Sequence, residues 1–96
     1  MDERNKLVVL YDYYGELLSD SQKKYFEDYY FNNLSLGEIS EEEGISRNAV
    51  HKQIKSAQEK LEFYEEKLRL IDKEKEILNS IKDENLKERI TKIIES

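Results

Sequence analysis

The chain lacks the residues from which many catalytic and metal sites are built. Its 96 residues include no cysteine, so a disulfide, a thiol nucleophile and a cysteine-ligated zinc site are all excluded. His51 is the only histidine, so several histidines cannot gather around one metal ion. Carboxylates are numerous, but they are not spaced like the ligands of a calcium-binding loop. We therefore expect no metal and no cofactor.

Proline is also absent, and glycine occurs only three times. Together with 40% charged residues, this composition favours helices joined by short connections, and we expect an all-α fold. No apolar run approaches the roughly 18 residues that a membrane-spanning helix needs. Residues 1–18 also lack the layout of a signal peptide. We expect a cytoplasmic protein with no membrane partner.

Catalytic motifs are missing as well. The sequence contains no glycine-rich phosphate-binding loop, and no Ser–His–acid arrangement stands out. We therefore expect no catalytic residues and a protein that is not an enzyme.

The charge of the chain changes sign in the middle of the sequence. The net charge is −6, which argues against a general nucleic-acid coat protein. Residues 37–46 contain four glutamates and no basic residue, whereas residues 47–60 contain four basic residues and one glutamate. A local basic surface is therefore possible on an acidic protein.

Hydrophobic periodicity and capping residues predict a succession of helices. The expected ranges are 3–18, 20–31, 36–43, 47 to at least 61 and on towards 70, and 83–95. Capping boxes are expected at Ser19 with Gln22 and at Ser35 with Glu38, and simple caps at Asp2, Ser46 and Asp83. The aromatic residues Tyr25, Phe26, Tyr29 and Tyr30 are expected to stack on Tyr11 and Tyr14. A small core explains this band, and a ligand-stacking platform is the alternative.

Beyond Leu61, apolar residues recur at steps of three and four, with Glu and Lys between them. This seam comprises Ala57, Leu61, Tyr64, Leu68, Ile71, Leu78 and Ile81. It resembles a short coiled-coil stripe that is interrupted at Glu74 or Lys75. We divide the chain into a helical domain at residues 1–61 and a C-terminal helical extension at residues 62–96. The extension either packs on its own domain or pairs with a second chain as a homodimer.

The segment around Gly44 has the features of a helix-turn-helix, which we place at residues 35–61. Glycine after a helix end supplies the left-handed conformation that reverses the chain. Apolar residues on both sides of it face one small core: Leu36, Ile39, Ile45, Val50, Ile54, Ala57 and Leu61. The outward positions of the second helix are polar or basic: Arg47, Asn48, His51, Lys52 and Lys55. We predict that these five residues contact DNA or RNA through the helix at residues 47–60.

Two family resemblances involve these residues. "LSLGEISEEEGISRNAVHKQIKSAQEKL" is similar to the promoter-recognising helix-turn-helix of bacterial sigma factors, region 4. The stretches "LYDYYGELLSDSQKKYFEDYYFNNLSLGEISEEEGISRNAVHKQI" and "LEFYEEKLRL" resemble the YlxM family of small helix-turn-helix proteins. Members of that family are encoded beside the signal recognition particle GTPase and its receptor. The resemblance implies a sigma region 4-like fold and a regulatory or accessory role in that protein-targeting pathway.

Two positions depart from the sigma-type pattern. Ser40 stands where a small alanine usually packs, and Glu43 stands where an apolar residue is usual. A buried unpaired carboxylate would be costly. We therefore expect Glu43 either to turn outward or to pair with a nearby base.

Two functions remain open at this stage. The first is nucleic-acid binding, with phosphate neutralisation by the basic residues supplying most of the affinity. The second is a protein-interaction module in which the helix-turn-helix is a scaffold. In that case the seam or the acidic face would meet another protein, and the resemblance names signal recognition particle components as candidates.

Overall fold

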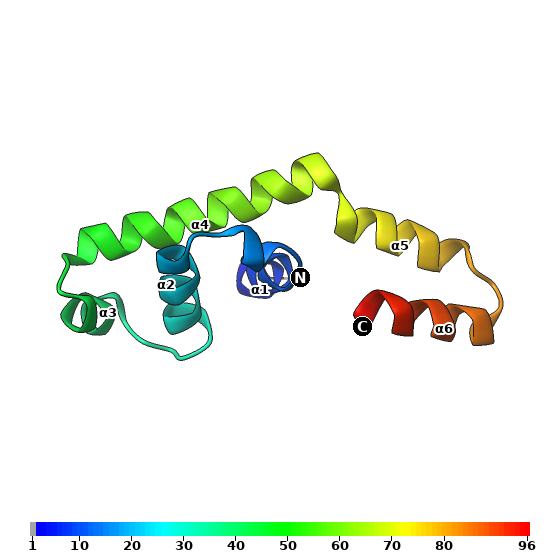
Figure 1. Cartoon of the computed structure of the whole chain (residues 1–96), viewed down its shortest axis with the longest axis horizontal. Coiled ribbons are helices and arrows are strands. Elements are labelled where there is room, and N and C mark those ends of the chain that lie inside the picture. The colour runs from blue at the N-terminus through cyan, green and yellow to red at the C-terminus, as the bar shows by residue number, and fades with distance from the viewer. Residues whose placement is uncertain (1) are drawn as a thin grey trace.

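A computed structural model describes residues 2–96, and every regular element within that range is helical. The elements in chain order are α1 (Glu3–Tyr14), the 3-10 turn η1 (Gly15–Leu17), α2 (Asp20–Tyr30), α3 (Leu36–Glu43), α4 (Arg47–Leu68), α5 (Leu70–Ser80) and α6 (Glu84–Glu95) (Figure 1). The predicted all-α class is confirmed.

None of the helices between residues 2 and 96 combines the length and the apolar character that a bilayer crossing requires.

The helix starts follow from local capping. Both predicted capping boxes are present. The Ser19 and Ser35 hydroxyls accept from the backbone N–H groups of Gln22 and Glu38, and the Gln22 and Glu38 side chains accept from the N–H groups of the two serines. Asp2, Ser46 and Asp83 cap α1, α4 and α6 as predicted. The first helix is shorter than expected, because it ends at Tyr14 and tightens into η1.

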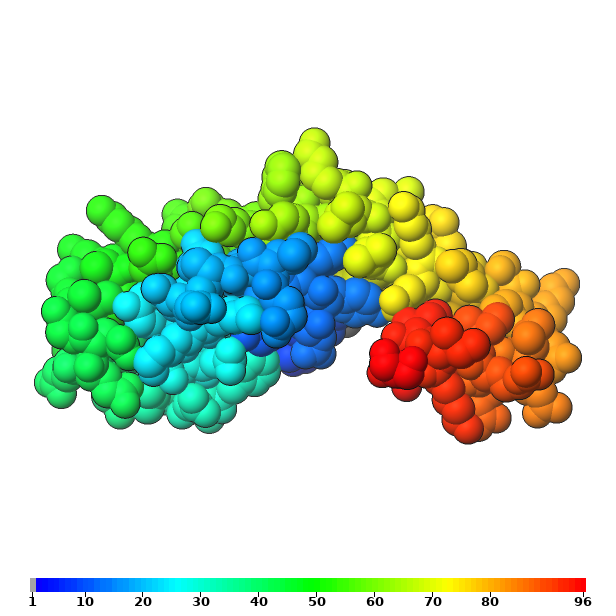
Figure 2. Space-filling model, viewed as in Figure 1, coloured from blue at the N-terminus to red at the C-terminus, as the bar shows by residue number. Residues whose placement is uncertain are grey.

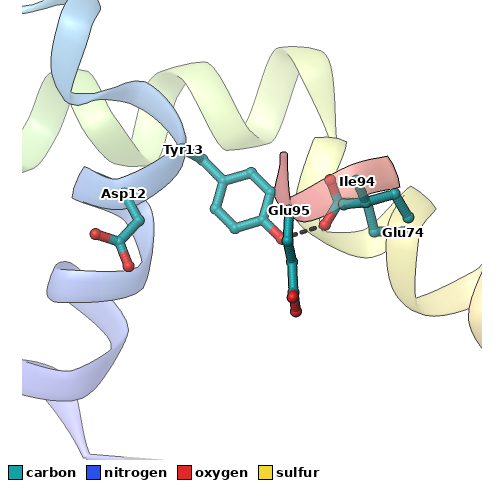
Figure 3. Close-up of a pocket in the computed structure, with 5 residues that line it drawn as sticks. All are labelled: Asp12, Tyr13, Glu74, Ile94 and Glu95. Carbon is teal, nitrogen blue, oxygen red and sulfur yellow. Dashed lines mark hydrogen bonds between the residues drawn. The ribbon is translucent and has the colours of Figure 1, made fainter. Parts of the chain in front are cut away.

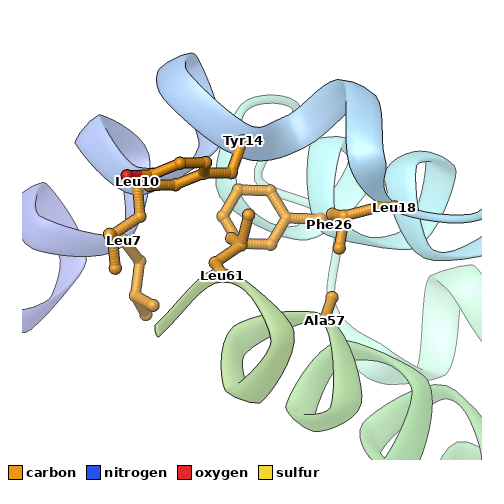
Figure 4. Packing of buried hydrophobic residues seen from close by; sticks show 7 residues of the cluster. All are labelled: Leu7, Leu10, Tyr14, Leu18, Phe26, Ala57 and Leu61. Carbon is orange, nitrogen blue, oxygen red and sulfur yellow. The ribbon is translucent and has the colours of Figure 1, made fainter. Parts of the chain in front are cut away.

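Helix α4 lies across α1, α2 and α3 and joins two clusters of buried side chains (Figure 1). The first cluster lies between α1, α2 and α4 and consists of Leu7, Leu10, Tyr14, Leu18, Phe26, Ala57 and Leu61 (Figure 4). The second cluster belongs to the helix-turn-helix and consists of Ile39, Val50 and Ile54, with Leu36 and Ile45 packed against it. The four apolar positions of α4 in these clusters therefore fix which face of α4 points to solvent.

The aromatic band is part of the core. The Tyr11 and Phe26 rings stack with centroids 4.6 Å apart and planes 8° apart. Phe26 is fully buried, while Tyr25, Tyr29 and Tyr30 pack against the second cluster. The Tyr14 ring packs against Tyr64 of α4, with 6.0 Å between the ring centroids. The interpretation of this band as a small core holds, although Tyr14 does not stack on α2.

The gap in the apolar stripe at Glu74 and Lys75 is not a break in the helix. Helix α5 runs through Glu74 and Lys75 without a break, and the helix break lies at Arg69, with φ 54° and ψ 33°. This left-handed residue separates α4 from α5 although it is not glycine. No glycine or proline marks the position in the sequence, but the end of α4 agrees with the expected end of the fourth helix towards residue 70.

Glu65 stabilises the start of α5, which has no side-chain cap of its own. Its carboxylate accepts from the N–H groups of Ile71 and Asp72, at 3.1 and 3.3 Å, and from the Tyr14 hydroxyl at 2.5 Å. The Tyr14 oxygen in turn accepts from the Leu70 N–H at 3.2 Å. These bonds attach the beginning of α5 to both α1 and α4.

Helices α5 and α6 form a hairpin at one end of the elongated molecule, whose principal extents are 53, 24 and 23 Å. In the space-filling view the hairpin is a separate lobe beside the N-terminal helices (Figure 2). Neither α5 nor α6 contains a buried residue. The division at residues 61 and 62 stays a prediction.

Candidate nucleic-acid interface

The turn between α3 and α4 has the predicted geometry. Gly44 adopts φ 68° and ψ 31°, a left-handed conformation that glycine takes at little cost. The N–H groups of Gly44 and Ile45 donate to the Ser40 carbonyl at 3.0 and 3.2 Å. The Ser46 hydroxyl then accepts from the Ala49 N–H at 3.1 Å and begins α4. The turn thereby fixes α4 against α3 with its first residues exposed.

The two departures from the sigma-type pattern are both accommodated. The Ser40 hydroxyl donates to the Ile45 carbonyl at 2.7 Å, so its polar atom is satisfied inside the turn. Glu43 pairs with Lys24 of α2 at 3.2 Å, which confirms the second of the two expected solutions. Lys24 also pairs with Asp28 at 3.1 Å, and the hydrogen bonds to Asp28 and Glu43 raise its pKa. Sequence reasoning did not identify Lys24, because no local pattern connects α2 to the end of α3.

The same ion pair explains a cluster of carboxylates. Oxygens of Asp28, Glu42 and Glu43 lie within 4.8 Å of one another, a spacing that a metal ion could bridge. The Lys24 ammonium already lies against two of these carboxylates, and the Asn32 amide donates to Asp28 at 3.1 Å. The cluster is therefore part of the packing of α2 on α3.

All five predicted contact residues are exposed on the first turns of α4. We call them the basic face: Arg47, Asn48, His51, Lys52 and Lys55. Residues three or four apart are neighbours on a helix, so these side chains form two adjacent rows. The buried Val50 and Ile54 lie on the opposite side of α4. No carboxylate of residues 2–96 forms an ion pair with Arg47, Lys52 or Lys55, so all three charges are available to a ligand.

Arg47 lies back against α3. A side-chain carbon added at Gly37 would come within 2.8 Å of a guanidinium nitrogen of Arg47. The absence of a side chain at Gly37 therefore leaves room for Arg47 across the start of α3. This position puts its charge at the junction of the two helices, where both helices of a helix-turn-helix approach the nucleic-acid backbone.

The basic face is small and has acidic borders. Lys60 does not belong to it, because its ammonium donates to Gln22 of α2 at 3.2 Å. Glu59 and Glu62 are exposed on the turns of α4 that follow the basic face. On the other side, Glu38, Glu41 and Glu42 line a hollow on α3 together with Leu34. Any phosphate must therefore bind within about three turns of α4.

A second concave surface lies between α1 and the C-terminal hairpin. This cleft of about 440 Å³ is lined by Asp12, Tyr13, Glu74, Ile94 and Glu95 (Figure 3). The Tyr13 hydroxyl donates to Glu74, and this hydrogen bond, with burial, raises the pKa of Tyr13 to about 12. Three carboxylates and no base repel phosphate, so the cleft is no part of a nucleic-acid interface.

Comparison with known families gives one match over the whole chain. The model of the family described as "UPF0122: Putative helix-turn-helix protein, YlxM / p13 like" matches residues 1–96.

Individual relatives come from several bacteria. A UPF0122 protein of Caldanaerobacter subterraneus is 51% identical over 84 residues, which cover 88% of this chain and 70% of that protein. One of Malacoplasma penetrans is 43% identical over 89 residues, covering 90% and 83%. One of Thermoanaerobacter pseudethanolicus is 51% identical over 75 residues, covering 78% and 64%, so the chain spans less than two thirds of that relative.

Proposed function

The chain belongs to the UPF0122 family of helix-turn-helix proteins, and we propose that it binds nucleic acid through the basic face of α4. The observation that carries the proposal is the exposure of Arg47, Lys52 and Lys55 without carboxylate partners, directly after a left-handed glycine turn. Asn48 and His51 lie between them and offer hydrogen bonds to base edges. The arrangement supports a binding role and not a catalytic one.

Electrostatics limits the strength of this binding. Each phosphate that a basic side chain neutralises releases a counterion, and three such contacts give a salt dependence with a log–log slope of about −2.7. The chain carries a net charge of −6, and glutamates border the basic face on both sides. We therefore propose a modest affinity that falls steeply as salt rises.

The shape of the surface favours duplex DNA among regular helices. An exposed α-helix fits the major groove of B-form DNA, whereas the major groove of A-form RNA is too narrow to admit it. An RNA target would have to present single-stranded or distorted segments, or phosphates alone. Duplex DNA and RNA are therefore tested separately in the binding experiment.

The YlxM resemblance adds a cellular setting to the proposal. It implies that the protein serves as a regulatory or accessory factor of the signal recognition particle pathway. That particle contains RNA, so its RNA is the natural ligand for the second arm. Binding to this RNA in preference to an unrelated RNA of equal length would support the setting.

A second candidate function is a protein-interaction module that acts on components of the same pathway. The observation that favours it is the acidic hollow of α3, where Glu38, Glu41 and Glu42 surround Leu34. Such a surface suits a basic protein segment better than a phosphate backbone. In this case the helix-turn-helix is a scaffold, and charge removal from α4 leaves binding unchanged.

The test is a titration of labelled duplex DNA and labelled particle RNA at low and physiological salt. We expect Arg47→Ala/Lys52→Ala/Lys55→Ala to weaken binding at least about tenfold and to remove most of the salt dependence. The matched control is Lys6→Ala/Lys75→Ala/Lys82→Ala, which removes the same charge from exposed positions outside the basic face. Equal losses in both variants, or no loss in the first, would rule out α4 as the contact surface.

A further inference from the structure

The C-terminal hairpin exposes a row of large apolar side chains. On α5, Leu70 and Ile77 are 43% and 48% exposed, and on α6, Leu86 and Ile93 are 46% and 72% exposed. We call these four residues the open face.

The spacing of these residues places them on one side of the hairpin. The two residues of each pair are seven positions apart and therefore share one side of their helix. In each helix a half-buried residue directly follows an open one: Leu78 follows Ile77, and Ile94 follows Ile93. One residue is a rotation of about 100°, so the half-buried side is offset from the open side in the same direction in both helices. In an antiparallel hairpin this equal offset brings both pairs to the same face. The open face is thus continuous across the two helices.

The surface area of the chain shows how much remains uncovered. The chain exposes 6886 Å², whereas a compact monomer of its mass exposes about 5,800 Å². Its radius of gyration is 16.5 Å, against about 12.5 Å for a compact chain of this length. The excess of about 1,100 Å² belongs to the whole elongated molecule, and it is larger than the roughly 800 Å² that one partner buries in a stable protein–protein interface.

The hairpin also lacks the internal packing that would stabilise it alone. Helices α5 and α6 have 11 and 12 residues, and neither buries a side chain. Isolated helices of this length are marginal in water, and most helical stability comes from covering an apolar face. The open face therefore needs an occupant.

The charge of the hairpin favours a second copy of the chain as that occupant. Residues 70–96 carry seven acidic and six basic residues, so the hairpin is almost neutral, whereas residues 1–69 carry fifteen and ten. A strongly charged partner of either sign finds little complementary charge there. Two identical hairpins are both nearly neutral, so they do not repel each other strongly. Each presents the same apolar open face to the other. We propose that two copies pair through the open faces as a twofold four-helix bundle.

Pairing at this site leaves the proposed nucleic-acid surface free. The hairpin lies at one end of the molecule, and the start of α4 lies at the other end (Figure 1). The dimer would therefore carry two basic faces, both open to ligand. Pairing of the hairpins does not require nucleic acid, so it can be measured with the protein alone.

The test is the mass of the full chain in solution over a concentration series. We expect a shift from 11.5 kDa towards twice that mass as concentration rises, and a midpoint of thermal unfolding that rises with it. The variant Ile77→Gln/Ile93→Gln should weaken self-association at least about tenfold, because it places amides on the open face. The control Leu17→Gln alters a side chain that is 53% exposed outside the hairpin and should pair like wild type.

Three outcomes would overturn the proposal. The first is a wild-type chain that stays at 11.5 kDa throughout, which would leave the open face to a different protein. The second is a dimer that Ile77→Gln/Ile93→Gln does not weaken. The third is equal weakening by the Leu17→Gln control.

Discussion

The first four helices and the last two differ in packing although their sequences look alike. Both regions consist of amphipathic helices rich in Glu and Lys. All ten buried apolar side chains of residues 2–96 lie between Leu7 and Leu61, and none lies in α5 or α6. An apolar stripe therefore predicts that a helix has a partner, but the partner of α1–α4 lies within the chain and the proposed partner of the hairpin lies outside it.

The sharpest way to probe this difference is to truncate one leucine in each region. Leu61 is fully buried in the first cluster, whereas Leu86 is 46% exposed on α6. We expect Leu61→Ala to lower the free energy of unfolding by about 2–5 kcal/mol, through lost burial and a residual cavity. Leu86→Ala should cost less than about 1 kcal/mol in dilute, monomeric protein.

Denaturant unfolding of both leucine variants at one low protein concentration checks this prediction. Similar losses of unfolding free energy in the two variants would show that the hairpin belongs to the same folded core as α1–α4. That result would contradict the proposal that the hairpin is covered by a second chain.

A smaller effect is expected at two of the left-handed residues that join helices. Gly44 has φ 68° in the helix-turn-helix, and Arg69 has φ 54° before the hairpin. Gly44→Ala should cost about 1–2 kcal/mol, because a Cβ disfavours this conformation. Arg69→Gly removes that same strain and should not destabilise by more than its ion pairs with Asp72 and Glu76 contribute, below about 1 kcal/mol.

Midpoints of thermal unfolding for Gly44→Ala and Arg69→Gly provide the measurement. If the midpoint of thermal unfolding falls further in Arg69→Gly than in Gly44→Ala, the side chain of Arg69 stabilises its junction by more than the strain that a Cβ causes at Gly44. That result would contradict the prediction.

The last of these small effects concerns the attachment of the hairpin through Glu65. Burial raises the pKa of Glu65, but hydrogen bonds from Tyr14 and from the N–H groups of Ile71 and Asp72 outweigh it, so the pKa lies below its usual value. A carboxyl with a lowered folded-state pKa stabilises the fold above its unfolded-state pKa. That stabilisation disappears as the pH falls through the folded-state pKa.

Glu65→Gln should therefore cost about 1 kcal/mol near neutral pH and progressively less in acid. The measurement is the free energy of unfolding against pH, with the exposed neighbour in Glu66→Gln as control. A difference between wild type and Glu65→Gln that stays constant with pH would contradict the assigned role of the carboxylate.

Local signals predicted most of the helix starts and the turn. Ser19, Ser35 and Gly44 act on groups within a few residues, so their effect can be inferred without a tertiary structure. The exposure of Lys52 and Lys55 could likewise be inferred, because the spacing of Val50 and Ile54 fixes the opposite face of α4.

Long-range and junction features could not be inferred in this way. The ion pair between Glu43 and Lys24 joins α3 to α2, and no residue pattern in the sequence predicts it. The break at Arg69 is stabilised by Tyr14 of α1 through Glu65 and Leu70, so it depends on the packing of α1 against α4. The interruption predicted at Glu74 or Lys75 is a gap in the apolar stripe and not a break in the helix, because α5 runs through both positions.

Amide hydrogen exchange across a concentration series is the most direct measurement of the contrast between the two regions. We expect the buried parts of α1–α4 to be protected at every concentration. Protection of α5 and α6 should be weak in dilute protein and should rise in step with the dimer fraction. Equal protection of α4 and α5–α6 in protein that is monomeric by mass would contradict the account.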